Sequence, residues 1–152
     1  MSHPKKVSFR GDAPATEVEI EVRYAETDRM GLVHHSRYLV WFEVARTRLC
    51  LESGFHYAAI EEMGYFLVVT RAELSYRQGA RYGDTVMVRC QLASFGSRGL
   101  AFSYEVRRGD TPLLTGTTEH VWVEAKSGRP CRIPEPLRPG FEALRGPDSP
   151  EP

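Results

Sequence analysis

The sequence has no net charge, few cysteines and no long apolar segment. Lysine plus arginine and aspartate plus glutamate number 20 each in 152 residues, so no overall field attracts the chain to nucleic acid or to an anionic membrane. No apolar run approaches the ~20 residues of a membrane-spanning helix. The N-terminal stretch MSHPKKVSFRGDAPATE lacks the apolar core of a secretory signal. We therefore expect a cytoplasmic protein that neither binds nucleic acid nor spans a membrane.

The cysteines are too few and too scattered to form a framework. Cys50, Cys90 and Cys131 are far apart and not in CxxC spacing, which favours reduced thiols over disulfides or a zinc site. His34 and His35 are adjacent, and no cysteine or acidic cluster completes a metal-ligand set with them. We expect neither a metal nor another cofactor.

The length and the distribution of proline and glycine indicate one domain. A chain of this size buries roughly 70% of its unfolded surface. Residues 1–15 show no periodicity, and glycine and proline recur after Lys126. The prediction is a flexible arm over 1–15, a single domain over 16–145 and a disordered tail over 146–152. Phe141 and Leu144 would allow a short docked segment near the end of the domain.

Two periodicities follow each other in the first half of the chain. Apolar and charged residues alternate over 16–24, which predicts a half-exposed strand. A long helix is then predicted from an apolar stripe at i, i+3, i+4, i+7 and i+11, formed by Tyr38, Trp41, Phe42, Ala45 and Leu49. Ser36 is a candidate cap at its start, and Gly54 marks its expected end. A short second helix should end at Gly64.

The second half of the chain is rich in β-forming residues. Four such segments cover 66–78, 84–96, 100–110 and 111–125, and short turns separate them. Short turns favour antiparallel pairing of successive strands. The fold class is therefore α+β, an antiparallel sheet with one long helix on one face. Because this leaves one face and the edges uncovered, we expect at least a dimer.

A carboxylate, Asp28, lies a few residues ahead of the predicted long helix. A helix N-terminus presents unpaired N–H groups and a partial positive charge, which can hold an oxyanion. Gly31 allows the chain to turn tightly or to lie close to a ligand. A carboxylate beside oxyanion donors is a minimal acyl-transfer site. An Asp ahead of a helix is also a common turn or cap residue, and spacing alone does not decide between the two.

The stretch YAETDRMGLVHHSRYLVWFEVART resembles the signature of hot-dog-fold acyl-CoA thioesterases of the 4-hydroxybenzoyl-CoA thioesterase-like family. The matching residues are Tyr24, Glu26, Thr27, Asp28, Gly31, Val33, His35, Tyr38, Ala45 and Arg46. The segment from Leu74 to Val88 is similar to the next landmark of that family, a strand followed by a Gly-Asp turn. The order of elements fits from about residue 16 to residue 125.

The resemblance implies a curved five-stranded antiparallel sheet wrapped around the long helix, with two subunits joining their sheets. It implies hydrolysis of acyl-CoA at sites on the dimer interface, without a cofactor. The catalytic carboxylate would be Asp28, in the loop with Gly31, and the oxyanion donor would be the backbone N–H of His35. Direct attack by Asp28 and activation of a water both remain open, as do homodimer and homotetramer.

The substrate contacts are less well defined by the sequence. The phosphates of CoA favour arginines near the rim of a site, and Arg77 and Arg98 are the candidates. Thr70 is a candidate contact for pantetheine. Tyr38 fits either the acyl pocket or the core. The ring of His35 is a further candidate for orienting the catalytic carboxylate or contacting the substrate.

Two alternatives stay open and a third is disfavoured. Another hot-dog lineage places its carboxylate on the long helix, where Glu43 either faces inward or pairs with Arg46 or Arg48. A non-catalytic protein that binds acyl thioesters would share the fold. A hydratase is disfavoured, because its pattern requires His five residues after the helix carboxylate and Arg48 occupies that position. The acyl group and its carrier, CoA or acyl carrier protein, are not defined by the sequence.

Overall fold

The computed structural model describes residues 9–146, and the order of its elements is the predicted one. The elements are β1 (Ala15–Glu21), the 3-10 turn η1 (Tyr24–Glu26), α1 (Arg37–Glu52), α2 (Tyr57–Glu62), β2 (Tyr65–Tyr76), β3 (Thr85–Phe95), β4 (Gly99–Arg108), β5 (Thr111–Glu124), η2 (Glu135–Leu137) and α3 (Arg138–Arg145). The predicted α+β class is confirmed.

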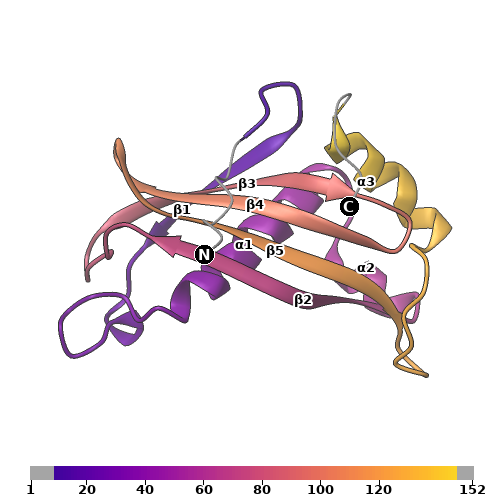
Figure 1. Cartoon of the computed structure of the whole chain (residues 1–152), viewed down its shortest axis with the longest axis horizontal. Helices are drawn as coiled ribbons and strands as arrows, with labels where there is room; N and C mark the ends of the chain where they lie inside the picture. The colour runs from indigo at the N-terminus through magenta and orange to yellow at the C-terminus, as the bar shows by residue number, and fades with distance from the viewer. Residues whose placement is uncertain (1–8, 147–152) are drawn as a thin grey trace, which may run out of the picture.

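All five strands form one antiparallel sheet in the order β1-β3-β4-β5-β2. The short turns that join β3, β4 and β5 make these strands neighbours, as predicted. Successive pairing is wrong for β2 and β3, because the connection between them crosses the end of the sheet. Val33 donates to Ala80 in that connection. As a result β2 lies at an edge of the sheet, and no other strand within residues 9–146 pairs with its outer side (Figure 1).

The long helix α1 lies across one face of the sheet and carries the centre of the core (Figure 1). Every residue of its predicted apolar stripe is buried: Tyr38, Trp41, Phe42, Ala45 and Leu49. The Phe42 ring stacks on Tyr104 of β4 with centroids 4.0 Å apart. Gly116 of β5 permits this approach, since a Cβ atom there would lie 2.6 Å from the Phe42 ring. The curved sheet around one helix is the arrangement that the family resemblance implies.

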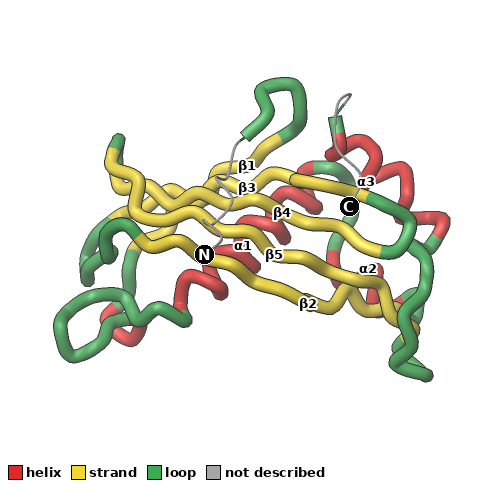
Figure 2. The backbone as a smooth tube through the Cα atoms, viewed as in Figure 1, coloured by secondary structure: helices red, strands yellow, loops and turns green. Residues whose placement is uncertain are grey.

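Helices α2 and α3 lie at the end of the sheet opposite the η1 loop (Figure 2). Phe141 of α3 packs against the rings of Phe55, Phe95 and Trp122, at 4.7, 5.9 and 5.6 Å between centroids. Leu144 is buried beside this cluster. The docked C-terminal segment allowed by the sequence is therefore present. None of the helices in the described part of the chain is long and apolar enough to span a bilayer.

Part of the predicted N-terminal arm contacts the domain. The Arg10 backbone N–H donates to the Gln91 side chain at 2.8 Å. The Arg10 guanidinium donates to the carbonyls of Leu92 and Arg145 at 2.7 and 3.1 Å. Residues 1–8 and 147–152 lie outside the described residues, so the limits of the arm (1–15), the domain (16–145) and the tail (146–152) stay predictions.

Helix α1 begins and ends where the sequence predicted, but the predicted capping hydrogen bond at its start is absent within the described residues. Ser36 is the N-cap residue, yet its side chain makes no capping bond. Its hydroxyl instead lies 2.8 Å from Nδ1 of His34, so the predicted cap bond is wrong. Gly54 follows the C-cap of α1 with a φ of 99°, a conformation that glycine adopts without steric cost.

A buried carboxylate attaches the loop ahead of α1 to the helix. Glu26 accepts a hydrogen bond from the indole of Trp41 at 2.7 Å and another from the backbone N–H of Arg23 at 2.8 Å. The Arg23 guanidinium lies 3.5 Å from the same carboxylate. Burial alone would raise the pKa of Glu26, but the hydrogen bonds from Arg23 and Trp41 outweigh it and lower that pKa below its ordinary value. The ionised carboxylate therefore stabilises the loop.

Replacing Glu26 with Gln should lower stability at neutral pH and reduce its dependence on acid. Since the folded state lowers the pKa, the carboxylate contributes stability above the ordinary glutamate pKa and loses it as the pH falls through the folded value. An amide matches the two donors less well, at a cost of about 1–3 kcal/mol. Thermal unfolding between about pH 7 and pH 2.5 should show a smaller fall in Tm for Glu26→Gln than for the wild type. Glu17→Gln, on an exposed position of β1, is the matched control, and parallel curves for Glu26→Gln and wild type would contradict this account.

Candidate active site

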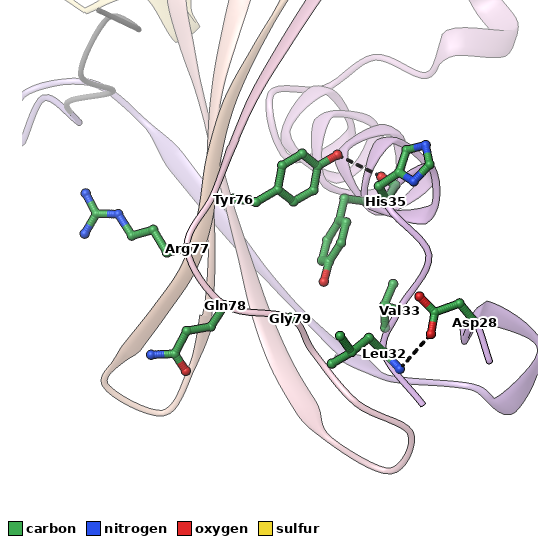
Figure 3. Close-up of a pocket in the computed structure, with 9 residues that line it drawn as sticks. Asp28, Leu32, Val33, His35, Tyr76, Arg77, Gln78 and Gly79 are labelled. Atoms are coloured by element: carbon green, nitrogen blue, oxygen red, sulfur yellow. Dashed lines mark hydrogen bonds between the residues drawn. The ribbon is translucent and has the colours of Figure 1, made fainter. Parts of the chain in front are cut away.

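A pocket of about 240 Å³ opens beside the start of α1 (Figure 3). Three segments line it: the loop ahead of α1, the first turn of α1, and the end of β2 with the connection that follows. The lining residues are Asp28, Leu32, Val33, His35, Tyr38, Tyr76, Arg77, Gln78 and Gly79. The fold thus brings four of the residues singled out in the sequence to one place, namely Asp28, His35, Tyr38 and Arg77.

Asp28 closes its own turn and still presents one oxygen to the pocket. Its Oδ1 accepts hydrogen bonds from the backbone N–H groups of Met30 and Leu32 at 2.8 and 3.2 Å. The Asp28 N–H donates to the Leu32 carbonyl at 2.7 Å, and Gly31 completes the turn with a φ of 77°. Within residues 9–146, Oδ2 has no hydrogen-bond partner, and Figure 3 shows it on the pocket side of the carboxylate. Asp28 is therefore a turn residue through Oδ1 and has a second carboxylate oxygen that is not used in the turn.

The backbone N–H of His35 is free between neighbours that are bonded. The N–H of His34 donates to the Glu26 carbonyl at 2.8 Å, and the N–H of Ser36 donates to Nδ1 of His34 at 3.2 Å. The N–H of Arg37 donates to the His34 carbonyl at 2.9 Å. No acceptor in the described chain engages the His35 N–H. It lies at the positive end of α1, where an unpaired N–H can stabilise an anion.

Tyr38 forms a wall between the pocket and the core. Its hydroxyl accepts a hydrogen bond from the Ala80 N–H at 3.1 Å. Its ring lies edge-on to Trp41 and Tyr76, with centroids 4.9 and 5.6 Å apart. Burial raises the pKa of the Tyr38 hydroxyl above its ordinary value. Tyr38 therefore belongs to the core and lines the pocket at once.

The histidine rings make no metal site and no contact with the carboxylate. The His34 and His35 rings lie 4.1 Å apart, and no hydrogen bond in the described region joins the His35 ring to Asp28. No group of three His, Cys, Asp or Glu side chains within residues 9–146 is arranged to hold a metal ion. The ring contact of His35 within the described residues is therefore the one with His34.

Two of the predicted substrate contacts, Arg77 and Thr70, do not point toward Asp28 or are not among the lining residues. Arg77 lines the pocket, but its side chain points away from Asp28 (Figure 3). Its backbone N–H donates to the Leu113 carbonyl at 2.8 Å. Thr70 lies at a bulge of β2, where its hydroxyl donates to the Glu119 carbonyl at 3.3 Å. Thr70 is not among the lining residues.

Arg98 lies at the other end of the sheet. It belongs to the turn between β3 and β4, next to Gly99, which pairs with Val121. Tyr76, beside the pocket, pairs with Leu114. Val121 and Leu114 are seven positions apart on β5, which corresponds to roughly 23 Å along a strand. Within one chain, Arg98 is therefore separated from the pocket by most of the length of the sheet.

Glu43 does not occupy either position considered for it. Its side chain is exposed on α1, so it does not face inward. Within the described residues it makes no ion pair with Arg46 or Arg48. The Arg46 guanidinium instead lies near the hydroxyls of Tyr57 and Tyr104. The rival catalytic carboxylate is thus outside the pocket in the single chain.

Sequence analysis did not single out Tyr76, although it contacts the site directly. Its hydroxyl donates a hydrogen bond to the His35 carbonyl at 3.0 Å. The two residues are 41 positions apart, and no periodicity connects them. The available signal was position alone: Tyr76 lies near the end of the strand predicted over 66–78 and shortly before Gly79.

Comparison with known proteins assigns a family to this geometry. The thioesterase-like superfamily matches residues 22–141. Bacillus subtilis YneP, named as a candidate acyl-CoA thioesterase, is 37% identical over 116 residues, which cover 76% of this chain and 84% of that protein. Haemophilus influenzae YbgC, named an acyl-CoA thioesterase, is 27% identical over 127 residues, covering 83% and 93%. The crystal structure of a DHNA-CoA thioesterase from Staphylococcus aureus superposes with a TM-score of 0.80 at 32% identity, covering 85% of this chain and 87% of that one.

Proposed function

The chain belongs to the thioesterase-like superfamily and is a thioester hydrolase with the hot-dog fold, and we propose that it hydrolyses acyl-CoA with Asp28 as its catalytic carboxylate. The observation that carries the proposal is one pocket lined by both Asp28 and His35. Among residues 9–146, one Asp28 carboxylate oxygen and the His35 backbone N–H have no hydrogen-bond partner. Relatives named for acyl-CoA support the substrate class. The products are a free carboxylic acid and CoA.

The His35 N–H would bind the carbonyl oxygen of the thioester. Negative charge develops on that oxygen as the carbonyl carbon becomes tetrahedral, and a fixed N–H at a helix N-terminus stabilises it without reorganisation. Loss of one such donor typically slows catalysis by about 10²–10³-fold. The leaving group is a thiolate, whose thiol has an ordinary pKa near ~8.5, so departure requires less help from a general acid than an amine does.

Asp28 would act through its second carboxylate oxygen. The first is held by the N–H groups of Met30 and Leu32, which fixes the direction of the second. In one route this oxygen attacks the carbonyl carbon, CoA thiolate leaves, and water hydrolyses the resulting anhydride. In the other it accepts a proton from a water that attacks the carbonyl. Both routes use the same oxygen and the same oxyanion donor.

Replacing Asp28 with Asn should abolish turnover without disturbing the loop. The amide oxygen can still accept the bonds from Met30 and Leu32, whereas an amide is neither a base nor a nucleophile of use here. The rate should fall by at least about 10²–10⁴-fold, the usual contribution of such a group. The measurement is release of free thiol from acetyl- to palmitoyl-CoA, benzoyl-CoA and phenylacetyl-CoA.

Glu43→Gln is the matched control for this experiment. Because Glu43 is exposed and outside the pocket, the turnover rate of Glu43→Gln should stay within about tenfold of the wild-type rate. This corresponds to a change in activation free energy of under ~1.4 kcal/mol. An inactive Glu43→Gln beside an active Asp28→Asn would refute the assignment. Tight binding of acyl-CoA without turnover by the wild type would instead favour a binding protein, and the same panel on acyl carrier protein would then test the other carrier.

We propose further that two chains pair through β2. This edge strand has 12 residues, and Phe66, Val68 and Val69 on it remain about two-fifths exposed, at 44%, 41% and 44%. The outer face of α1 also exposes apolar side chains, namely Leu39, Val40, Val44 and Leu51. An unpaired edge with apolar side chains is a template for a second strand, and a two-fold arrangement satisfies both edges at once.

A second chain would also enlarge the site. The pocket of one chain, about 240 Å³, is below the ~300–1,000 Å³ of most ligand pockets. The end of β2 lines this pocket, so a chain paired along β2 would lie next to it. Arg98 or Thr70 of that second chain could then approach the substrate, which they do not do within their own chain.

Val68→Lys should separate the chains. A lysine on the outer part of β2 is a common device against edge pairing, and the half-exposed position tolerates it within one chain. Light scattering after gel filtration should show the wild type at a multiple of the 17.2 kDa chain mass and the variant near one chain, with turnover reduced. Tyr82→Lys, an exposed aromatic away from β2 and α1, should keep the wild-type mass. A wild type at the mass of one chain would contradict the proposal.

A further inference from the structure

The peptide groups on both sides of His35 are held by hydrogen bonds. The carbonyl of His34 accepts from the Arg37 N–H at 2.9 Å, which fixes the peptide plane between His34 and His35. In a trans peptide the N–H points opposite to the carbonyl of the same plane, so this bond is one restraint on the direction of the His35 N–H. The carbonyl of His35 itself, in the next plane, accepts from the Tyr76 hydroxyl at 3.0 Å.

The Tyr76 hydroxyl supplies a hydrogen bond to the His35 carbonyl, which no backbone N–H of the described helix provides. His35 precedes the first residue of α1, and within residues 9–146 its carbonyl has no backbone donor. Without Tyr76, the peptide that follows His35 would be restrained only through the Ser36 N–H and its contact with the exposed His34 ring. The two torsions of His35 would then set the direction of the oxyanion donor less tightly.

Tyr76 is itself well anchored. It is the last residue of β2 and pairs with Leu114 of β5. Its ring packs edge-on against Tyr38 at 5.6 Å. Burial raises the pKa of its hydroxyl, so the group is a proton donor at neutral pH. Tyr76 therefore connects the edge of the sheet to the start of the helix (Figure 3).

We propose that Tyr76 is a positioning residue that aims the His35 N–H at the thioester carbonyl oxygen. This role rests on the proposed function, and in it Tyr76 acts through His35 and does not itself contact the reacting atoms. Tyr76 lines the pocket and is 51% exposed, so a bound acyl group covers it and removes water from the bond to His35. A hydrogen bond shielded from water is stronger, and the donor is held most firmly when the substrate is in place.

Tyr76→Phe removes the hydroxyl and keeps the ring. The expected result is a kcat lower by roughly 3- to 10-fold, the worth of one hydrogen bond, with KM within about twofold and an unchanged Tm. Tyr82→Phe is the matched control, since the Tyr82 hydroxyl is exposed and has no hydrogen bond in the described chain; its kcat should equal that of the wild type.

A second measurement reports on the carbonyl directly. The probe is a ketone analogue of acyl-CoA, with CH₂ in place of sulfur and ¹³C at the carbonyl, observed by difference infrared spectroscopy. Binding to the wild type should lower the C=O stretching frequency, because the His35 N–H polarises the bond. Tyr76→Phe should return the frequency toward that of free analogue, while Tyr82→Phe should not. A purely structural role for Tyr76 would alter Tm and leave this frequency unchanged.

The outcomes separate the two proposals. Wild-type kcat and carbonyl frequency in Tyr76→Phe would overturn the positioning role and leave the proposed function intact. A raised KM with unchanged kcat would also overturn it, because the hydroxyl would then contact the substrate itself. Absence of turnover by the wild type on every acyl-CoA would overturn the proposed function and this inference with it.

Discussion

The bond between the Glu26 carboxylate and the Trp41 indole is the constraint on which the rest of the site depends. It joins the 3-10 turn after β1 to the second turn of α1. The carbonyl of the same Glu26 accepts from the His34 N–H, so one residue holds the loop at two points. Asp28 and Gly31 lie in the sequence between Glu26 and His34. The two bonds of Glu26 therefore hold the ends of the turn that Asp28 and Gly31 form. Asp28 and His35, the residues that we propose as catalytic carboxylate and oxyanion donor, thus lie in a loop that is bonded to the core.

Burial of a carboxylate costs desolvation free energy. The geometry around Glu26 explains why the fold tolerates one at this position. Two hydrogen bonds and a nearby guanidinium satisfy Glu26, which offsets its desolvation. An apolar residue of similar volume could fill the space, but it would not set the direction of the loop. Catalysis by fixed dipoles requires that the groups already point correctly before the substrate arrives.

Much of the architecture follows from local pattern. The stripe from Tyr38 to Leu49 predicts α1 because a helix buries every third or fourth residue, and the β-rich runs predict β2 to β5 within a few residues of their ends. The loop with Asp28 and Gly31 is also a local signal. The bond from Tyr76 to His35 was not predictable, because it joins residues 41 positions apart through the register of β2 on β5. The distance between Arg98 and the pocket, and the exposure of Glu43, likewise depend on how the strands and the helix are placed in space.

The edge strand connects assembly with chemistry. Its outer side is the surface through which we propose that two chains pair. Its last residue, Tyr76, donates to the carbonyl of His35, the residue whose N–H we propose as oxyanion donor. A strand paired on both sides moves less than an edge strand, since more of its backbone is hydrogen-bonded. Pairing would therefore restrain Tyr76, and through it the His35 N–H, and it would also bring a second chain beside a pocket of about 240 Å³. On this argument a single chain would lose activity in two ways, through an incomplete pocket and through a less well-aimed donor.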